Sequence, residues 1–409
     1  MAFSFHSNVK LRLRASQGGF TLIELMVAMA IGMIVVLAVT GMIVVSQTHE
    51  RVTTGANDMS QSGAFTATIL DNSIRSAGAG FSQYWNRGVM GCKLNVKRDG
   101  AQILPRTTAL PAPFAAVMGG SPGVANLRLA PLLIAQGQSA GGSDVLIAMS
   151  GLANVGDVPR AVRTYTDADS KLYLENTVSI RQGDVLVVSR EGTTDCILTQ
   201  VDGGTPPFSD TVGQTAVPLG GTYFNTESAD GSVTLNTLAL NSAGRTMLSA
   251  IGSADNLQMQ AFGVGADSVL YRYDLLRSSG QDASEAMAEG VVAMRAIYGV
   301  DSNIDDPDAT RSPAWQEPTG DFDLSALIAQ SPPTRMRSIT AVRIALLVRS
   351  NARQNQVVAD ASYTLLEGQP GAATVSVADA DRHYAHRIVE TTIPLRSMMM
   401  RLLPPEELL

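Results

Sequence analysis

The chain has 409 residues, of which 45% are hydrophobic and 16% charged, and this balance excludes both wholesale disorder and a small disulfide-stabilised fold. Its formal net charge is −7, and setting aside the three basic residues Lys10, Arg12 and Arg14 at the N-terminus leaves −10 on the remainder. An acidic surface repels phosphate backbones, so the bulk of the chain is not expected to bind nucleic acid.

Residues 20–45 form an apolar segment whose only charged residue is Glu24. As an α-helix these 26 residues would be about 39 Å long at ~1.5 Å per residue, which is enough to cross a bilayer. The basic residues precede the segment, so the positive-inside rule places the N-terminus in the cytoplasm and everything after about residue 46 outside it. A cleavable secretory signal is the alternative, but its apolar core would be shorter, ~7 to 15 residues.

The apolar segment begins with the string GGFTLIEL, from Gly18 to Leu25. This string resembles the class III signal of type IV prepilins and pseudopilins. The resemblance implies that a prepilin peptidase cuts after Gly19 and that Phe20 becomes the N-methylated first residue. A carboxylate in a membrane helix costs roughly 2.5 to 3.5 kcal/mol unless it is paired, and Glu24 would pair with the amino terminus of a neighbouring subunit in the fibre. An ordinary single-pass anchor is the alternative.

The helix is expected to continue past the membrane to about residue 80. No proline occurs from Phe20 to Ala77, and apolar residues recur near helical spacing over 57–77. Gly78 and Gly80 are expected to end it. Glycine weakens a helix by about 1 kcal/mol relative to alanine, so Gly41 is the expected point of local melting on assembly.

Beyond residue 80, short β-type runs alternate with Gly, Ser, Asp and Pro, which predicts an antiparallel β-rich head over 81–409. With a leader at 1–19 and a helix at 20–80, the expected fold class is α+β and pilin-like. One short helix is expected at 324–330, and 202–255 is the expected boundary if the head has two lobes. The expected strands are 144–149, 184–189, 195–201, 232–238, 268–276, 291–300, 339–348 and 387–395.

The two cysteines, Cys92 and Cys196, lie 104 positions apart, which excludes a CxxC redox or zinc motif. Both follow the membrane helix and are expected to face an oxidising compartment, where a single long-range disulfide can form. Two free buried thiols are the alternative.

Several head segments, taken together, resemble one family. The first is Gly91-Cys92, soon after the helix. The others begin at Gly183 (GDVLVVSREGTTDCILTQV), Val269 (VLYRYDL), Glu289 (EGVVAMRAIYGVDSN), Ala341 (AVRIALLVRS) and His386 (HRIVETTIPLR). In this order they resemble the PilW family of type IV pilus minor pilins. The resemblance implies a low-abundance subunit that joins other minor pilins in a complex that primes pilus assembly and sits at the pilus tip, supporting adhesion and motility.

The same resemblance implies partners and a location. The partners are other minor and major pilins, the prepilin peptidase, the inner-membrane assembly platform and a tip adhesin. The chain would cross the bacterial inner membrane once, with its head in the periplasm, and then enter the extracellular pilus. A minor pseudopilin of a type II secretion system is one alternative. Another is a pilin-anchored adhesin or ligand-binding module whose function lies in the insertions 101–138 and 202–255.

The sequence predicts no enzyme and no firm metal site or cofactor, since it contains no phosphate-binding loop, GxSxG elbow or HExxH helix. Asp301, Asn303 and Asp305 match the first ligands of a calcium loop. The match then fails, because Asp306 replaces the turn glycine and Ser312 the bidentate glutamate. A solvated turn is therefore preferred, with a calcium site as the alternative.

The last apolar run is Met398 to Leu403. It is expected to form a final strand packed on the head, and a docking surface for a neighbouring pilin is the alternative.

Overall fold

The structure is a computed structural model. Its contacts separate two compact units, residues 1–54 and 55–409. The described residues are 19–82, 85, 89–106, 108–117, 127–151, 159–204, 208–210, 213–240, 245–276, 284–304, 306, 312–329 and 333–399. The basic residues of the expected leader therefore lie outside the described part of the chain.

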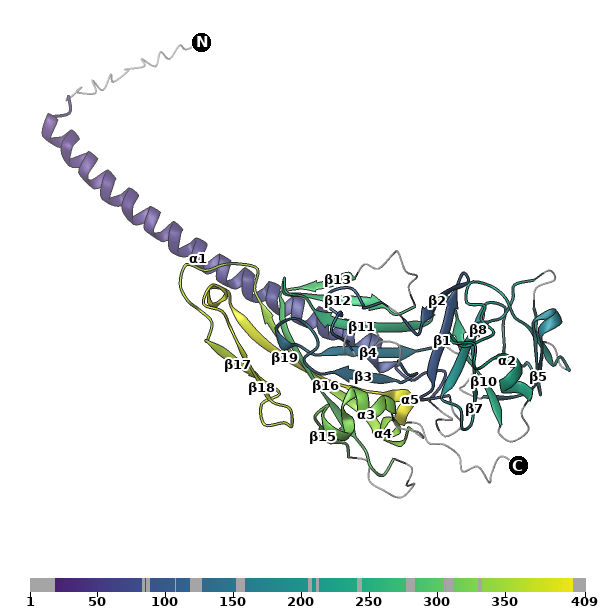
Figure 1. Cartoon of the computed structure of the whole chain (residues 1–409). Helices are drawn as coiled ribbons and strands as arrows, with labels where there is room; N and C mark the ends of the chain where they lie inside the picture. Colours follow the sequence, from purple (N-terminus) through teal and green to yellow (C-terminus); the bar gives the residue numbers. More distant parts are fainter. Residues whose placement is uncertain are drawn as a thin grey trace, which may run out of the picture. The chain divides into compact units, whose positions relative to one another are not determined.

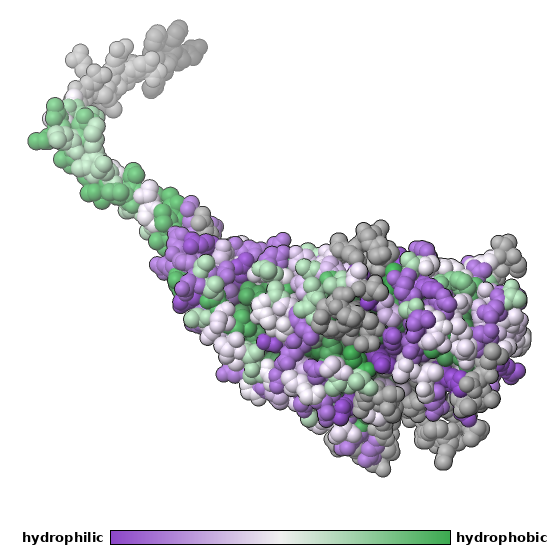
Figure 2. All heavy atoms as spheres, in the orientation of Figure 1, coloured by the Kyte–Doolittle hydropathy of each residue, from purple (hydrophilic) through white to green (hydrophobic). Residues whose placement is uncertain are grey.

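One long helix, α1 (Leu22–Arg75), runs without a break through both units. In the first unit every described side chain of the helix is exposed, and Figure 2 shows the apolar character of this stretch. Among the described residues it is the helix that is long and apolar enough to cross a membrane, in agreement with the sequence. Gly41 lies inside the unbroken helix, and its melting on assembly stays a prediction.

In the second unit the buried face of α1 packs against the head. A Cβ added at Gly63 would lie 2.8 Å from the Val389 side chain, so glycine allows the helix to approach the sheet closely. The helix ends at Arg75, just before the glycines expected to terminate it. Gly78 and Gly80 have φ of +85° and +88°, a backbone region that favours glycine and turns the chain out of the helix.

Two antiparallel sheets and a hairpin form the part of the head that we call the proximal body (Figure 1). The largest apolar core combines α1 residues such as Leu70 and Ile74 with residues of both sheets. The five-stranded sheet has the order β13 (Glu285–Glu289), β12 (Val269–Asp274), β11 (Gln258–Val264), β4 (Val145–Ser150) and β3 (Leu132–Ala135). The four-stranded sheet has the order β15 (Ala314–Gln316), β14 (Val291–Val300), β16 (Ile339–Arg349) and β19 (His386–Pro394). The hairpin is β17 (Ser362–Leu365) and β18 (Ala373–Ser376).

An eight-stranded sheet, which we call the distal sheet, lies beyond the end of α1 (Figure 1). The chain enters it twice, first with β1 and β2 and again with β5 to β10. A second apolar core with Leu172, Leu186 and Leu248 packs on it. Its order is β2 (Ala101–Leu104), β1 (Lys93–Arg98), β8 (Asp195–Gln200), β7 (Asp184–Arg190), β10 (Thr246–Ser253), β5 (Arg160–Thr166), β6 (Lys171–Leu174) and β9 (Ala216–Pro218).

Four short helices complete the described elements. They are α2 (Leu235–Leu240), α3 (Leu324–Ala329), α4 (Thr334–Ser338) and α5 (Arg396–Met399). The helix expected at 324–330 is thus confirmed as α3. Residues 202–255 contain β9, α2 and β10, and a division of the head into two lobes there stays a prediction.

All the expected strands are confirmed except one. The strand expected at 232–238 is wrong, because the chain forms α2 there. The Thr237 N–H donates to the Thr234 hydroxyl at 3.1 Å, and the Thr234 N–H donates to the Thr237 hydroxyl at 2.8 Å. This reciprocal cap starts a helix whose Leu235 and Leu238, three residues apart, share its buried face.

The final strand expected from Met398 is also wrong within the described residues. Met398 and Met399 belong to α5, whose first turn is closed by a bond from the Met398 N–H to the Leu395 carbonyl at 3.1 Å. The buried Arg337 guanidinium donates to the Met398 carbonyl and holds this turn against the sheet. Residues 400–403 lie outside the described residues.

Candidate functional site

The first turn of α1 contains a capping box formed by Thr21 and Glu24. The Thr21 backbone N–H and hydroxyl both donate to Glu24 Oε2 at 3.2 Å, and the Glu24 N–H donates to Thr21 Oγ1 at 3.3 Å. The carboxylate thus lies at the positive end of the helix dipole with two donors. These contacts offset part of the cost of a charge in an apolar segment.

The sequence analysis predicts only a cation as the partner of Glu24, so the contact with Thr21 is a new finding. Its signal is the Thr-x-x-Glu spacing directly before an apolar run. Glu24 remains exposed in the single chain, so its carboxylate is open to a second partner.

The two residues that flank the expected cleavage are open to solvent. Phe20 is 87% exposed, and no described atom lies within 4 Å of a Cβ placed on Gly19. Among the described residues, no side chain therefore packs against Gly19. Cleavage after Gly19 and methylation of Phe20 stay predictions.

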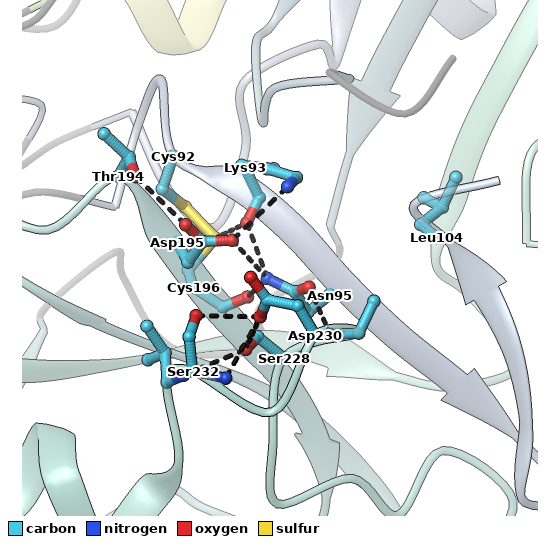
Figure 3. Close-up of polar contacts among 12 residues, drawn as sticks. Cys92, Lys93, Asn95, Leu104, Thr194, Asp195, Cys196, Ser228, Asp230 and Ser232 are labelled. Atoms are coloured by element: carbon cyan, nitrogen blue, oxygen red, sulfur yellow. Dashed lines mark hydrogen bonds and ion pairs between the residues drawn. A yellow bond between two sulfur atoms is a disulfide. The ribbon is translucent and has the colours of Figure 1, made fainter. Parts of the chain in front are cut away.

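Cys92 and Cys196 form a disulfide with their Cα atoms 5.7 Å apart, which confirms the predicted pairing (Figure 3). Cys92 directly precedes β1 and Cys196 lies in β8, and Leu94 pairs with Cys196 in the parallel register of the two strands. The Cys92 carbonyl also accepts a bond from the Leu129 N–H at 2.8 Å. The bridge therefore fixes the point at which the chain first enters the distal sheet.

A buried asparagine beside the disulfide joins three segments (Figure 3). The Asn95 amide donates to Asp195 Oδ1 at 3.0 Å and to the Cys196 carbonyl at 3.2 Å, while its Oδ1 accepts from the Ala229 N–H at 3.0 Å. Lys93 Nζ lies 3.9 Å from Asp195 Oδ1. Because these polar groups satisfy one another, we assign them a structural role.

The turn that follows Ala229 is closed by an aspartate. Asp230 Oδ1 accepts bonds from the hydroxyls of Ser228 at 2.6 Å and Ser232 at 2.8 Å, and from the Ser232 N–H at 3.1 Å. These bonds, that of Ser228 above all, hold the pKa of Asp230 well below its usual range. The described residues contain no group of three or more His, Cys, Asp or Glu side chains arranged to hold a metal ion.

The acidic segment after β14 begins as a hydrogen-bonded turn. Asp301 Oδ1 accepts from the Asn303 N–H at 3.0 Å, and the Asn303 carbonyl accepts from the Asp306 N–H at 3.0 Å. Asp301 is 5% exposed. Asp305 lies outside the described residues, so the calcium site stays a hypothesis.

Insertion 101–138 lines a surface cleft of about 650 Å³. The lining also includes Tyr271, whose hydroxyl donates to Asp267 Oδ2 at 2.6 Å, and this bond raises the pKa of Tyr271. The cleft combines apolar surface with a carboxylate and two hydroxyls, a mixture typical of small-molecule sites. Its lining is Pro111, Ala112, Pro113, Ala140, Gly265, Ala266, Asp267, Tyr271 and Ser284.

Two family models match the chain. The model of the type IV pilus-assembly protein W, PilW, matches residues 258–397, and the prokaryotic N-terminal methylation motif matches residues 14–40. No curated protein and no solved structure matches the chain.

The chain has the architecture of a pilin. A methylation motif leads into a long apolar helix, and a β-rich head of antiparallel sheets follows. The C-terminal match shows that residues 258–397 are similar to the type IV pilus-assembly protein PilW, and the two matches together are consistent with a PilW-type pilin. The match begins with β11 and ends in α5, so it covers most of the proximal body and leaves the distal sheet outside.

Proposed function

We propose that the chain is a minor pilin that helps to initiate type IV pilus assembly and occupies the pilus tip. The observation that carries this proposal is the position of the distal sheet relative to the PilW-matched body. The turn after α1 abuts the distal sheet, because a Cβ on Gly80 would lie 3.1 Å from the Ile251 Cα of β10. The distal sheet continues from there, beyond the helix end (Figure 1).

In a fibre of parallel pilin helices, each subunit is followed by another whose head must fit beyond it. A subunit with an additional sheet past its own helix end fills that space. The tip is the position where nothing follows, so the distal sheet can be accommodated there without a clash. It would also present its surface to a tip adhesin or an external target.

The N-terminal segment supports the same role through its chemistry. After cleavage behind Gly19, the Phe20 amine becomes a cation at the start of an apolar helix. In the low dielectric of the fibre core either charge alone costs several kcal/mol, so the amine of one subunit and Glu24 of its neighbour attract each other. This pairing would fix the axial register of a new subunit against the growing complex.

The proposal includes a path through the cell. The helix anchors the precursor in the bacterial inner membrane with the head in the periplasm, where the prepilin peptidase processes it. The assembly platform then joins it to the other minor and major pilins. An oxidising periplasm is consistent with the Cys92–Cys196 disulfide.

Deletion of the gene tests this function against that of a pseudopilin. Sheared surface pili and secreted enzymes are assayed in parallel in the deletion strain and in a complemented strain. Loss of pili with normal secretion is expected. Loss of secretion with normal pili would overturn the proposal in favour of a type II secretion pseudopilin.

A ligand-binding role of the insertions is a second candidate, and the cleft beside Tyr271 supports it. Tyr271→Ala is expected to leave pilus numbers unchanged, because the side chain lies at a surface cleft. If this variant also left adhesion of piliated cells unchanged, the cleft would have no part in adhesion.

A further inference from the structure

A groove of about 280 Å³ lies at one end of the four-stranded sheet. Ala341 and Pro394 come from the two strands β16 and β19, and Trp315 comes from the short edge strand β15. Met399, the last residue of α5, also lines the groove and is 45% exposed. The lining is thus mainly apolar and includes a large side chain open to solvent.

We propose that this groove binds Arg401 to Leu403 of the chain's own C-terminal segment. The two leucines would cover Trp315 and Met399, and the Arg401 guanidinium would pair with Asp301. These three tail residues lie outside the described part of the chain. The proposal does not depend on the function proposed above.

Chain connectivity places the tail at the groove. Met399 belongs to the lining itself, and Leu403 follows four residues later. A chain spans at most ~3.3 to 3.6 Å per residue, so Leu403 stays within about 14 Å of Met399. A tether this short gives the leucines a high effective concentration at the groove, so modest contacts are sufficient for binding.

Charge favours the same occupant. Asp301 lines the groove at 5% exposure, and its Oδ1 accepts one bond from the Asn303 N–H. A guanidinium can bind a carboxylate through two parallel hydrogen bonds, which are the stronger for being charge-assisted. Arg401 supplies this group two residues after Met399, directly before the apolar pair.

Residues 307–311, with the sequence PDATR, are a second candidate occupant, because they lie close in sequence to Pro313, which lines the groove. This segment contains no large aliphatic or aromatic side chain. It could offer a charge to Asp301, but it could not cover Trp315 with comparable apolar area. The tail, with Leu402 and Leu403, fits the lining better.

Tryptophan fluorescence of the full-length chain in detergent tests the proposal. The chain has two tryptophans, so Trp85→Phe leaves Trp315 as the single fluorophore. The Trp85 indole nitrogen is buried and bonds to no described group, so this change removes no described hydrogen bond. In this background, Leu402→Ser with Leu403→Ser is expected to red-shift the emission and steepen acrylamide quenching.

The matched control places the same changes further along, Leu408→Ser with Leu409→Ser, beyond Pro404 and Pro405. This control is expected to behave as the parent. Arg401→Ala is expected to shift the emission in the same direction as Leu402→Ser with Leu403→Ser, but by less. The proposal would be overturned if the Leu402 and Leu403 double variant gave the same spectrum as the parent, or if the Leu408 and Leu409 control changed as much as that double variant.

A cross-link gives a second, independent measurement. Thr392 is exposed and lines the groove, so Thr392→Cys combined with Leu403→Cys is expected to form a bridge within one chain. Thr392→Cys combined with Leu409→Cys serves as the control and is expected to form less. Peptide mass spectrometry and non-reducing gels detect the product. Bridges that form only between two chains, or no bridge, would overturn binding of the chain's own tail.

Discussion

The Thr21 hydroxyl donates to the Glu24 carboxylate at 3.2 Å in the first turn of α1. Glu24 therefore already has a partner within the single chain, before any other subunit is present. In the assembled fibre we expect the carboxylate to accept the Phe20 amine of a neighbour in addition to, or in place of, this contact. A capping contact of this kind is worth ~1 kcal/mol, which is small beside the cost of an unpaired charge in low dielectric.

Glu24→Ala is expected to leave membrane insertion and cleavage intact and to reduce incorporation into pili. The reason is that only the assembled state needs the carboxylate to offset the amine. Co-purification of the other minor pilins and counts of surface pili measure the effect. Thr21→Ser, which keeps the hydroxyl, is the control and should assemble normally. Unchanged co-purification and pilus numbers in Glu24→Ala would refute the pairing.

Gly19→Val is expected to block processing, because the peptidase requires a small residue before the cleaved bond. The full-length precursor would then accumulate in the membrane. Mass spectrometry of the mature wild-type protein should find a methylated Phe20 as its first residue. Any other N-terminus contradicts the assignment of Gly19 and Phe20.

Removing the disulfide is expected to destabilise the head. The bridge closes a loop between positions separated by 104 residues. In the chain-entropy model such a loop contributes up to about 4.7 kcal/mol. Denaturant unfolding of the full-length chain carrying Cys92→Ala and Cys196→Ala measures the loss, with chemically reduced wild type as the control. Equal midpoints for oxidised wild type and the double variant would show that the bridge adds no stability.

Stability is expected to fall in mild acid because of His386. Its Nδ1–H donates to the Tyr384 carbonyl at 2.8 Å, and its buried Nε2 bonds to no described group. Burial lowers the pKa of His386 from the ordinary value of 6.5; the Tyr384 carbonyl and Asp381 oppose this shift, and Arg349 adds to it. A histidine whose pKa is lower in the folded than in the unfolded chain contributes its full stabilisation of the fold at pH values above its unfolded pKa.

That stability is lost as the pH falls below 6.5 toward the folded pKa. The His386 ring stacks on Tyr363 with centroids 5.7 Å apart, and His386→Phe keeps a ring in this place. The variant should show a flatter decline of the unfolding midpoint as the pH falls below 6.5. An equally steep decline in wild type and variant would assign the acid sensitivity to other groups.

The longest strands of the proximal body are predictable from the sequence, because they are long apolar runs. The ten-residue β14 and eleven-residue β16 are examples. Much of the distal sheet is missed, since β5 carries exposed polar residues and β9 has three residues. Such strands are defined by their neighbours in the sheet more than by their own periodicity.

Local capping explains the clearest errors. At α2 the mutual bonds between Thr234 and Thr237 outweigh the β-propensity of threonine and valine. At α1 the same type of motif gives Glu24 a partner that hydrophobicity alone does not reveal. The disulfide was predictable because only two cysteines had to be paired, whereas the groove beside Trp315 depends on segments brought together by the fold.

Immunogold labelling of an epitope in the distal sheet tests the central claim most directly. Gly192, an exposed turn residue between β7 and β8 with no described atom near its Cβ position, is a suitable insertion point. The same epitope at Gly368, the exposed turn between β17 and β18, controls for access to the proximal body. For both insertions we expect gold particles at one end of sheared pili. Labelling along the shaft, or no labelling of intact pili, would contradict a position of this subunit at the pilus tip.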